Sequence, residues 1–544
     1  MPQRLRIRHS DLAGTSRLFS DFVYNTDRVL RWIGEDYRET ESYRTTAERL
    51  VSCRWPRREI SDILCEQNEA FGASKETLSN ISRITDGDAL FAITGQQVGM
   101  LGGPLLVLFK ALTVIKLAAS LSDALSHPVV PVFWMATDDH DFPEINHVNI
   151  PDTDGNLSRI EYRPETSVDG KAMSDVTLEG GVNQFIDEAL GMLPDSEFKP
   201  PLERLMRSAC TPGEKLGVSF AKFLLSYLGK YGLIVVDPSD KGLRAVASGI
   251  IEHEISAHES TRRIIGKTND SLVDAGYHLQ VRRNPDYLSV FHHTDKRSRV
   301  GFRDGRFFIE GLEENLTEED LKSRLLTRPE DFSPSALLRP VVQSRLFPVV
   351  AFVAGPAEVA YYAQMYGLFS EFDVVAPVIY PRMSATLVES RWRRFIERSE
   401  IELPKLIGFE ERDALLKSII SKRIPVELND ELSSLETEID KKLSAIDSHL
   451  AGDQSMKRSF EQTGRKIKRE LDLFRERLVR SQKRSDDEFT QKFMRCARHL
   501  FPEQSLQERH YSFLYFIDKY GPDVVDEIHR TLDLNENDHQ VITL

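Results

Sequence analysis

Five short apolar runs, each ending in a polar loop, set the pattern of the first 385 residues. Runs of four to eight apolar residues rich in Val, Ile and Phe are typical of strands that are covered on both faces. They occupy residues 89–94, 129–136, 232–237, 347–353 and 374–380. Helical periodicity separates several of them, so the pattern predicts an α/β fold with a parallel sheet built from right-handed crossovers.

Other segments surround this predicted sheet. Residues 1–85 have apolar positions three and four apart, which predicts a helical layer packed on the sheet. An Asp-Thr-Asp-Gly turn predicts a hairpin at the start of an insertion at about 150–212. Segments 277–283, 288–293 and 306–310 alternate and are separated by turn residues, which predicts an antiparallel meander. It belongs to a second insertion, at about 260–331.

The composition changes near residue 385, which divides the chain into a core of residues 1–385 and a helical region of residues 386–544. In residues 432–450, apolar positions repeat at alternating spacings of three and four, the pattern of a coiled-coil seam. A similar stripe occupies residues 456–478. A break at residues 452–453 separates the two, so we expect an antiparallel helical hairpin.

The composition narrows the class of protein. Hydrophobic residues make up 40% and charged residues 29% of the 544 residues, as in ordinary globular proteins. The net charge of -14 argues against nucleic-acid binding, which needs a basic surface. The four cysteines include no Cys-x-x-Cys pair, so neither disulfides nor structural zinc are indicated. No apolar run approaches the length of a membrane-spanning helix. We therefore expect a cytoplasmic protein that does not bind membranes.

The first apolar run leads into a loop rich in Gly and Gln. Its candidate ligand-binding residues are Gly95, Gln96, Gln97, Gly99 and Gly103. A Pro-started helix follows, and free amide groups together with the helix dipole favour an anion there. The spacing matches neither a Walker loop nor the dinucleotide fingerprint. A plain tight turn is the alternative.

Four titratable residues follow the second run: Asp138, Asp139, His140 and Asp141. Ligands in open α/β sheets bind outside the carboxyl ends of the strands, which is where this cluster lies. In an extended segment Asp139 and Asp141 face one way while Asp138 and His140 face the other, so all four cannot serve one site. The alternative is a helix cap formed by Asp138.

Further candidates flank the last two runs. Arg339 lies on a Pro-flanked loop, and its planar guanidinium suits a carboxylate or a phosphate. A Gly-Pro turn after the fourth run starts a helix in which Glu358 and Tyr361 share a face near the ligand edge. Ordinary packing is the alternative for Tyr361. Arg382 follows the fifth run.

Four motifs in series carry a family resemblance. They are ITGQQVGMLGGP with Lys110 after it, PVFWMATDDHDFPEINHV, FSPSALLRP with VAGPAEVAYYAQ, and LFPEQSLQER. Over nearly its whole length the chain resembles the BshC family, the cysteine-adding enzymes of bacillithiol biosynthesis. The resemblance implies a Rossmann-like core with two connecting insertions and a C-terminal coiled coil that supports a homodimer. It also implies amide-bond joining of cysteine to glucosaminyl-malate, the last step in making this low-molecular-weight thiol.

The implied chemistry gives the candidate residues roles. His140 is the candidate general base for the sugar amine, because the ordinary pKa of a histidine lies near neutrality. Asp139 and Asp141 are expected to orient the amine or to hold a magnesium ion. The loop at Gly95 would bind an anion. Arg339 and Arg382 are expected to clamp the malyl carboxylates.

The implied reaction needs an energy source. Amide formation from a free carboxylate is uphill in water, so ATP or ADP with Mg is expected, and no zinc is expected. Glu358 is expected to bind the ammonium group of cysteine. The sequence departs from class I synthetase-like enzymes, because no His-x-Gly-His motif follows the first run and Pro381-Arg382-Met383-Ser384 is only a faint echo of a Lys-Met-Ser-Lys-Ser loop. The alternative functions are another nucleotide-dependent transferase of the same fold and a non-catalytic dimeric coiled-coil scaffold.

Overall fold

The structure is a computed structural model in which two compact units are distinguished. It describes residues 5–12, 14–85, 87–282, 284–312, 314–407, 412–421, 426–449, 454–485 and 487–544. The first unit contains Met1–Asp152, Leu157–Thr386 and Gln507–Ile542, and the second contains Thr153–Asn156, Leu387–Leu506 and Thr543–Leu544. Gln507–Ile542, which we call the return segment, thus belongs to the unit that contains the sheet, although it follows the helices of the second unit in sequence.

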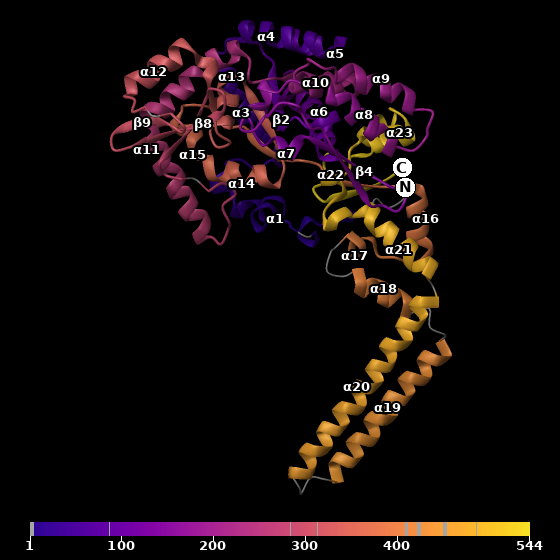
Figure 1. Cartoon of the computed structure of the whole chain (residues 1–544). Helices are drawn as coiled ribbons and strands as arrows, with labels where there is room; N and C mark the ends of the chain where they lie inside the picture. The colour runs from indigo at the N-terminus through magenta and orange to yellow at the C-terminus, as the bar shows by residue number, and fades with distance from the viewer. Residues whose placement is uncertain are drawn as a thin grey trace. The chain divides into compact units, whose positions relative to one another are not determined.

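The core of the first unit is a five-stranded parallel sheet (Figure 1) in the order β12-β11-β2-β3-β6. Its strands are β2 (Leu90–Gln96), β3 (Val129–Met135), β6 (Ile234–Val236), β11 (Val349–Ala354) and β12 (Val378–Pro381). The predicted parallel α/β core is confirmed. The chain adds strands from β2 toward one edge and then, from β11, toward the other. The switch point of the sheet, where such folds bind ligands, therefore lies between β2 and β11.

The fifth strand begins later than its apolar run predicts. Asp373 has a positive φ of 49°, a turn conformation that does not continue as a strand. Pro377 has no backbone N–H and cannot donate to a sheet ladder. Regular pairing with β11 therefore begins at Val378, opposite Ala351.

Helix α6 (Leu105–Leu125) packs against β2 and β3. The side chains of Leu105, Leu108 and Leu112 are buried. Among the described residues, this one helix is long and apolar enough to cross a membrane by length and composition alone. The expectation that no apolar run reaches that length is therefore wrong. Because 72% of its most apolar window is buried inside the protein, α6 is a core helix here.

The N-terminal segment forms the predicted helical layer. Its helices are α1 (Arg17–Tyr24), α2 (Leu30–Ile33), α3 (Thr40–Val51), α4 (Arg57–Ala70) and α5 (Lys75–Thr85). Helix α3 packs on β11 and α6, and α4 packs on β6.

Two inserted segments carry small antiparallel sheets. In the first, β4 (His147–Pro151) pairs with β5 (Leu157–Glu161), which confirms the predicted hairpin. The helices α8 (Gly181–Met192) and α9 (Lys199–Ala209) follow. The second sheet has the order β10-β7-β8-β9. Its strands are β7 (Tyr287–His293), β8 (Arg297–Arg303), β9 (Arg306–Ile309) and β10 (Phe332–Pro334), and α12 (Glu318–Thr327) precedes β10.

One predicted strand of the meander, at residues 277–283, is wrong within its described part, residues 277–282. The side-chain oxygen of Gln364 accepts from the backbone N–H of Val281 at 2.8 Å, and its Nε2 donates to the Val281 carbonyl at 2.9 Å. A side chain thus takes the place of a neighbouring strand. Arg283 lies outside the described residues.

The second unit is helical. Its long helices are α19 (Val426–His449) and α20 (Gln454–Ser485), which lie side by side in Figure 1. Ion pairs join Glu436 to Arg475, Asp440 to Lys468 and Asp447 to Lys457. Because residue numbers rise on one helix as they fall on the other, the pair is antiparallel and the predicted hairpin is confirmed. The predicted break at Gly452 and Asp453 lies outside the described residues.

We predict that Gly102→Ala destabilises the fold. Gly102 precedes α6, has a φ of 85°, and a Cβ there would lie 2.6 Å from the Phe513 ring of the return segment. Strain and overpacking together should lower the free energy of unfolding by about 1–3 kcal/mol in chemical denaturation. Gly191→Ala in α8, where a Cβ meets nothing within 4 Å, is the control and should be neutral or stabilising. Equal effects of the two changes would contradict the prediction.

Candidate functional site

The carboxyl ends of the central strands border a cavity of about 350 Å³ at the switch point. The predicted site residues that line it are Gly95, Gln96, Gln97, Asp139, Arg339, Glu358 and Arg382. Those that do not line it are Gly99, Gly103, His140, Asp141 and Tyr361. Lys110, Glu144, Gln343 and Arg509 also line it, although sequence reasoning assigned them no role.

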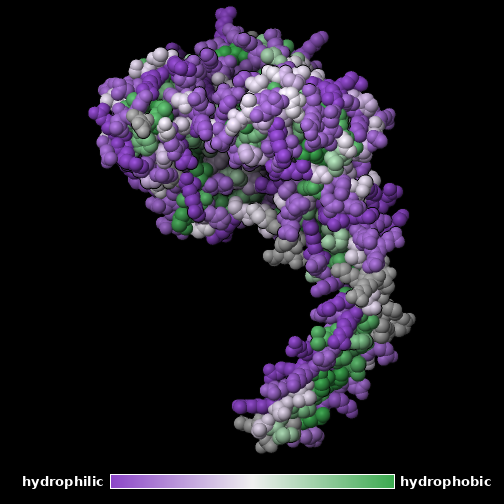
Figure 2. Space-filling model, in the orientation of Figure 1, coloured by the Kyte–Doolittle hydropathy of each residue, from purple (hydrophilic) through white to green (hydrophobic). Residues whose placement is uncertain are grey.

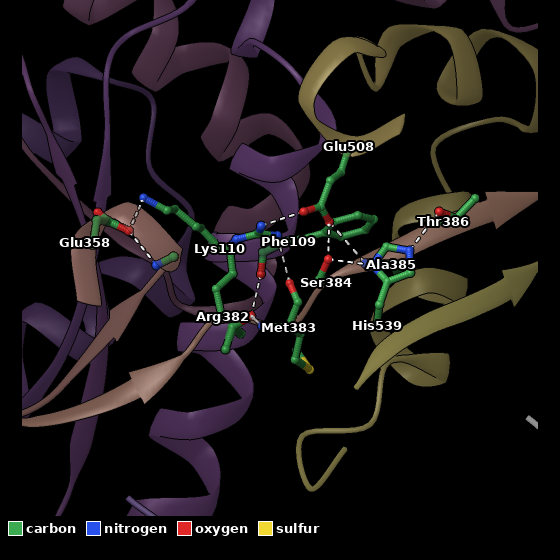
Figure 3. Close-up of polar contacts among 12 residues, drawn as sticks. Phe109, Lys110, Glu358, Arg382, Met383, Ser384, Ala385, Thr386, Glu508 and His539 are labelled. Atoms are coloured by element: carbon green, nitrogen blue, oxygen red, sulfur yellow. Dashed lines mark hydrogen bonds and ion pairs between the residues drawn. The ribbon is translucent and has the colours of Figure 1, made fainter. Parts of the chain in front are cut away.

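Lys110, on α6, links the two strands at the switch point (Figure 3). Its ammonium group donates to the carbonyl oxygen of Gly95 at 2.6 Å and to the side-chain oxygen of Gln96 at 2.8 Å. It forms an ion pair of 2.7 Å with Oε2 of Glu358 in α14 (Pro356–Met365). Burial lowers the pKa of Lys110, and the negative charge of Glu358 opposes that shift. All three N–H donors of the ammonium are used. Lys110 therefore holds the site together and has no free donor for a ligand.

Glu358 keeps one oxygen for a ligand. Its Oε2 accepts from Lys110 and from the backbone N–H of Gly355 at 2.7 Å, which caps the start of α14. Its Oε1 has no hydrogen-bond partner in the part of the chain that the structure describes. A carboxylate with one free oxygen in a cavity suits an ammonium group.

The side-chain amide of Gln97 holds two carboxylates together on one side of the cavity. Its Nε2 donates to Asp139 at 2.7 Å and to Glu144 at 2.8 Å. Burial by itself would raise the pKa of Asp139, but hydrogen bonds from Gln97 and from the N–H of His140 bring that pKa below its ordinary value. This acidic side therefore attracts cations. Among the described residues, no group of three or more His, Cys, Asp or Glu side chains is placed to hold a metal.

Asp138 and Asp139 have different partners, as predicted, but the predicted grouping of His140 with Asp138 is wrong, because residues 136–139 form a turn and His140 lies beside Asp139. Asp138 is buried and forms an ion pair with Arg244 of α11 (Lys241–Asp274), so the alternative in which Asp138 caps a helix is wrong. Asp141 is exposed and stands before the short helix α7 (Phe142–Ile145) without a side-chain cap bond.

His140 lies beside the cavity and not in its lining. Its Nδ1 is 3.6 Å from Oδ1 of Asp139 and 3.4 Å from a guanidinium nitrogen of Arg297, on β8. Its side chain is 47% exposed. Burial lowers the pKa of Arg297 to about 10, so its guanidinium remains charged at neutral pH. Because the imidazole is close to Asp139 and partly exposed, it can reach a ligand that contacts Asp139.

Two further residues that line the cavity are the arginines Arg339 and Arg382. Arg339 is the first residue of α13 (Arg339–Leu346) and does not lie on a loop as predicted, because the helix begins immediately before Pro340. Its guanidinium donates to the Tyr361 hydroxyl at 3.1 Å and has no acidic partner among the described residues. Burial raises the pKa of Tyr361 to about 12, so the hydroxyl stays protonated. Tyr361 thus orients Arg339.

Arg382 differs from Arg339 because its charge is neutralised. It forms a buried ion pair of 2.5 Å with Glu508 of the return segment (Figure 3). Arg382 lines the cavity, but its guanidinium is engaged within the protein. The sequence signal for Glu508 was its position in the motif LFPEQSLQER, which carried the resemblance but indicated no contact with Arg382.

The loop of residues 95–103 has one part that faces the cavity and another that packs on the return segment. A Cβ at Gly95 would lie 2.9 Å from the backbone oxygen of Trp134, so the close approach of β2 and β3 requires glycine there. Gly99 and Gly103 lie outside the lining. The helix start that follows them pairs with the return segment, since the N–H of Leu105 donates to the Tyr511 carbonyl at 2.8 Å. The part of the loop that faces the cavity is residues 95–97.

Fold and site together are those of an α/β protein of the Rossmann-like type with a cavity lined by charged side chains at its switch point. Two family models match: the N-terminal Rossmann-like domain of bacillithiol biosynthesis BshC over residues 5–383, and its C-terminal coiled-coil domain over residues 385–544. The chain belongs to the BshC family.

Curated relatives agree with this assignment. A "Putative cysteine ligase BshC" of Salinibacter ruber is 30% identical over 528 residues, covering 96% of each chain. One of Koribacter versatilis is 31% identical over 523 residues, covering 95% of this chain and 96% of the relative. A solved structure titled putative arginyl tRNA synthetase, from Campylobacter jejuni, is 10% identical and covers 86% of this chain and 100% of its own, with a TM-score of 0.20. That likeness is too low to support any argument.

We predict that Lys110→Met strongly destabilises the protein. The Lys110 side chain is 5% exposed, and its loss leaves the carboxylate of Glu358 without its cation. Removing one partner of such a pair should lower the free energy of unfolding by about 3–5 kcal/mol in guanidinium denaturation. Adding Glu358→Gln should restore part of the loss, because the uncompensated charge disappears. A single variant as stable as the wild type would show that the pair is dispensable.

Proposed function

We propose that this chain joins cysteine to glucosaminyl-malate through an amide bond, at the cavity between β2 and β11. The observation that carries the proposal is the division of charge in that cavity. Gln97 holds the carboxylates of Asp139 and Glu144 together, and Arg339 lines the same cavity without an acidic partner among the described residues. The reaction joins an amine to a carboxyl group, and the cavity offers carboxylates for the amine and a guanidinium for a carboxylate. The two alternatives, another transferase and a scaffold, are not favoured by the family membership.

Each charged residue of the cavity would then bind or deprotonate one group of the substrates. The acidic side receives the sugar amine, and His140, next to Asp139, takes the proton that the amine loses as the carbon–nitrogen bond forms. The free oxygen of Glu358 binds the ammonium of cysteine. Arg339, oriented by Tyr361, binds a malyl carboxylate.

Activation by ATP with magnesium belongs to the same proposal. When bound, ATP would supply the free energy and the leaving group for amide formation, because one carboxyl oxygen of cysteine would leave joined to phosphate or to AMP as the carbon–nitrogen bond forms. Magnesium takes one or two protein carboxylates and otherwise water and phosphate oxygens. Asp139 and Glu144 fit that pattern, because Gln97 holds both within hydrogen-bond distance of one amide. Product formation from cysteine, glucosaminyl-malate and MgATP, followed by mass spectrometry, tests the activity. Cells that lack the protein should accumulate glucosaminyl-malate.

We predict that His140→Ala lowers the ligation rate by about 10²-fold or more, because a general base is lost. Folding should be unaffected, since the His140 ring is 47% exposed. Steady-state rates and thermal melting are measured together. His253→Ala is the matched control, because that side chain is 44% exposed and lies outside the cavity lining. Wild-type rates in His140→Ala would remove His140 from catalysis.

We further propose that the protein is a cytoplasmic homodimer formed through the helical hairpin. Several apolar side chains of α19 and α20 remain exposed after the hairpin closes: Leu435, Ile446, Met456, Ile467 and Phe474. Figure 2 shows hydrophobic residues gathered along this hairpin. An apolar stripe left uncovered within one chain favours association with a second copy, most simply with two-fold symmetry.

We predict that Ile467→Lys combined with Phe474→Lys yields a folded monomer. Both side chains are exposed, 39% and 46%, so the hairpin itself does not depend on them. Light scattering should show half the wild-type mass, with helix content unchanged by circular dichroism. Asp472→Lys on the same helix is exposed and polar, and should leave the mass unchanged. A wild-type protein that is already monomeric at micromolar concentration contradicts the dimer.

A further inference from the structure

Two consecutive residues of the return segment, Glu508 and Arg509, lie at the site, one buried and the other exposed. Both lie on α22 (Gln507–His510). Glu508 is fully buried, whereas Arg509 is exposed and lines the cavity. Consecutive residues of a helix point about 100° apart, so one side chain can enter the protein while the next faces the cavity.

Glu508 anchors the segment beside the cavity (Figure 3). Its Oε1 accepts from Arg382 at 2.5 Å, and its Oε2 accepts from the hydroxyl of Ser384 at 3.0 Å and from the N–H of Ala385 at 3.1 Å. Burial would raise the pKa of Glu508, but Arg382, His539 and the N–H of Ala385 together lower it to about 2. The carboxylate is therefore ionised and fully bonded, and it cancels the charge of Arg382.

His539 fastens the other end of the segment to the same residues. Its Nδ1 is 2.7 Å from the Ser384 hydroxyl, and its Nε2 is 2.8 Å from the Thr386 hydroxyl. Since Ser384 donates its hydrogen to Glu508, it must accept from Nδ1, and Nε2 in turn accepts from Thr386. Burial lowers the pKa of His539 to about 4. A neutral imidazole with both nitrogens bonded holds the segment in one position.

Arg509 has no such partner. Within the described residues no carboxylate pairs with it, although it lies next to Glu508 in sequence. Desolvation by the surrounding protein lowers the pKa of Arg509, and the neighbouring Arg382 adds to that effect while Glu508 opposes it. Together with Arg339, Arg509 is one of two guanidinium groups that line the cavity without an acidic partner. An oxyanion that enters the cavity would supply the missing charge.

We propose that Arg509 is an anion-binding residue of the ligase site, and that Glu508 and His539 are positioning residues that hold it there. The inference rests on the proposed function for the identity of the reaction. The group that Arg509 binds is an oxyanion, either a carboxylate of the malyl substrate or a phosphate of the nucleotide. The site of ligation is thus completed by residues from beyond the helical hairpin in sequence.

The test is Arg509→Gln, with the KM for glucosaminyl-malate and the KM for ATP measured separately. One of them should rise about tenfold or more, corresponding to the loss of a charge-assisted hydrogen bond, while kcat and the melting temperature change little. A rise for glucosaminyl-malate identifies the carboxylate, and a rise for ATP identifies the phosphate. Arg530→Gln, an exposed cation of the same segment outside the cavity lining, should leave both unchanged. Unchanged KM values in Arg509→Gln overturn the proposal.

Two additional measurements separate the possible failures. Glu508→Gln should raise the same KM as Arg509→Gln, and Glu508→Asp should restore part of the affinity; a lower melting temperature with an unchanged KM would refute the positioning role. Calorimetric titration with malate and with ATP gives a readout without turnover. Binding to the wild type that is lost in Arg509→Gln supports Arg509 even if no ligation is detected, in which case only the proposed reaction fails. A wild-type protein that binds neither probe argues against Arg509 as an anion site.

Discussion

Three hydrogen bonds from one buried ammonium group determine the geometry of the switch point. Crossovers in a parallel sheet leave its centre in opposite directions, so the ends of β2 and β11 are free to diverge there. Lys110 bonds to the last residues of β2 and to the first turn of α14, which follows β11. A buried charge is tolerated only when all its donors have partners, and this ammonium meets that condition. The cavity, its free Glu358 oxygen and the loop at Gln97 all take their positions from this one group.

The pairing of charges separates the scaffold from the site. Asp138 with Arg244 and Arg382 with Glu508 are buried pairs that cancel within the protein. The groups left over, Arg339 above all, face the cavity. An ion pair that is already neutral within the protein gains little electrostatic energy from a charged ligand. The specificity for charged ligands therefore depends on side chains that have no oppositely charged partner in the protein. A residue type alone does not reveal which of these two groups it joins.

The sheet and helices could be predicted from sequence because apolar runs and helical periodicity are local signals. Proximity to the strand ends also predicted that Gln97, Asp139 and Glu358 would line one cavity. Other predictions failed or were missed because they depend on contacts distant in sequence. The Gln364 side chain prevents a strand at residue 281, and the partners of Arg382 and Asp138 lie more than 100 positions away. No local pattern encodes such partners.

The order in which the ribosome makes the chain gives the return segment a further meaning. Gln507–Ile542 is synthesised after the whole helical hairpin, yet Glu508 belongs to the buried network behind the cavity. Until that stretch has emerged, Arg382 lacks its counter-ion, and the N–H of Leu105 lacks the Tyr511 carbonyl that accepts from it. The sheet can form during translation. The charge of Arg382 in the cavity lining is neutralised only after the hairpin has left the ribosome, because Glu508 is synthesised after the hairpin. Completion of the site is therefore delayed until the hairpin has been made, and a nascent chain that stops within it cannot assemble the site.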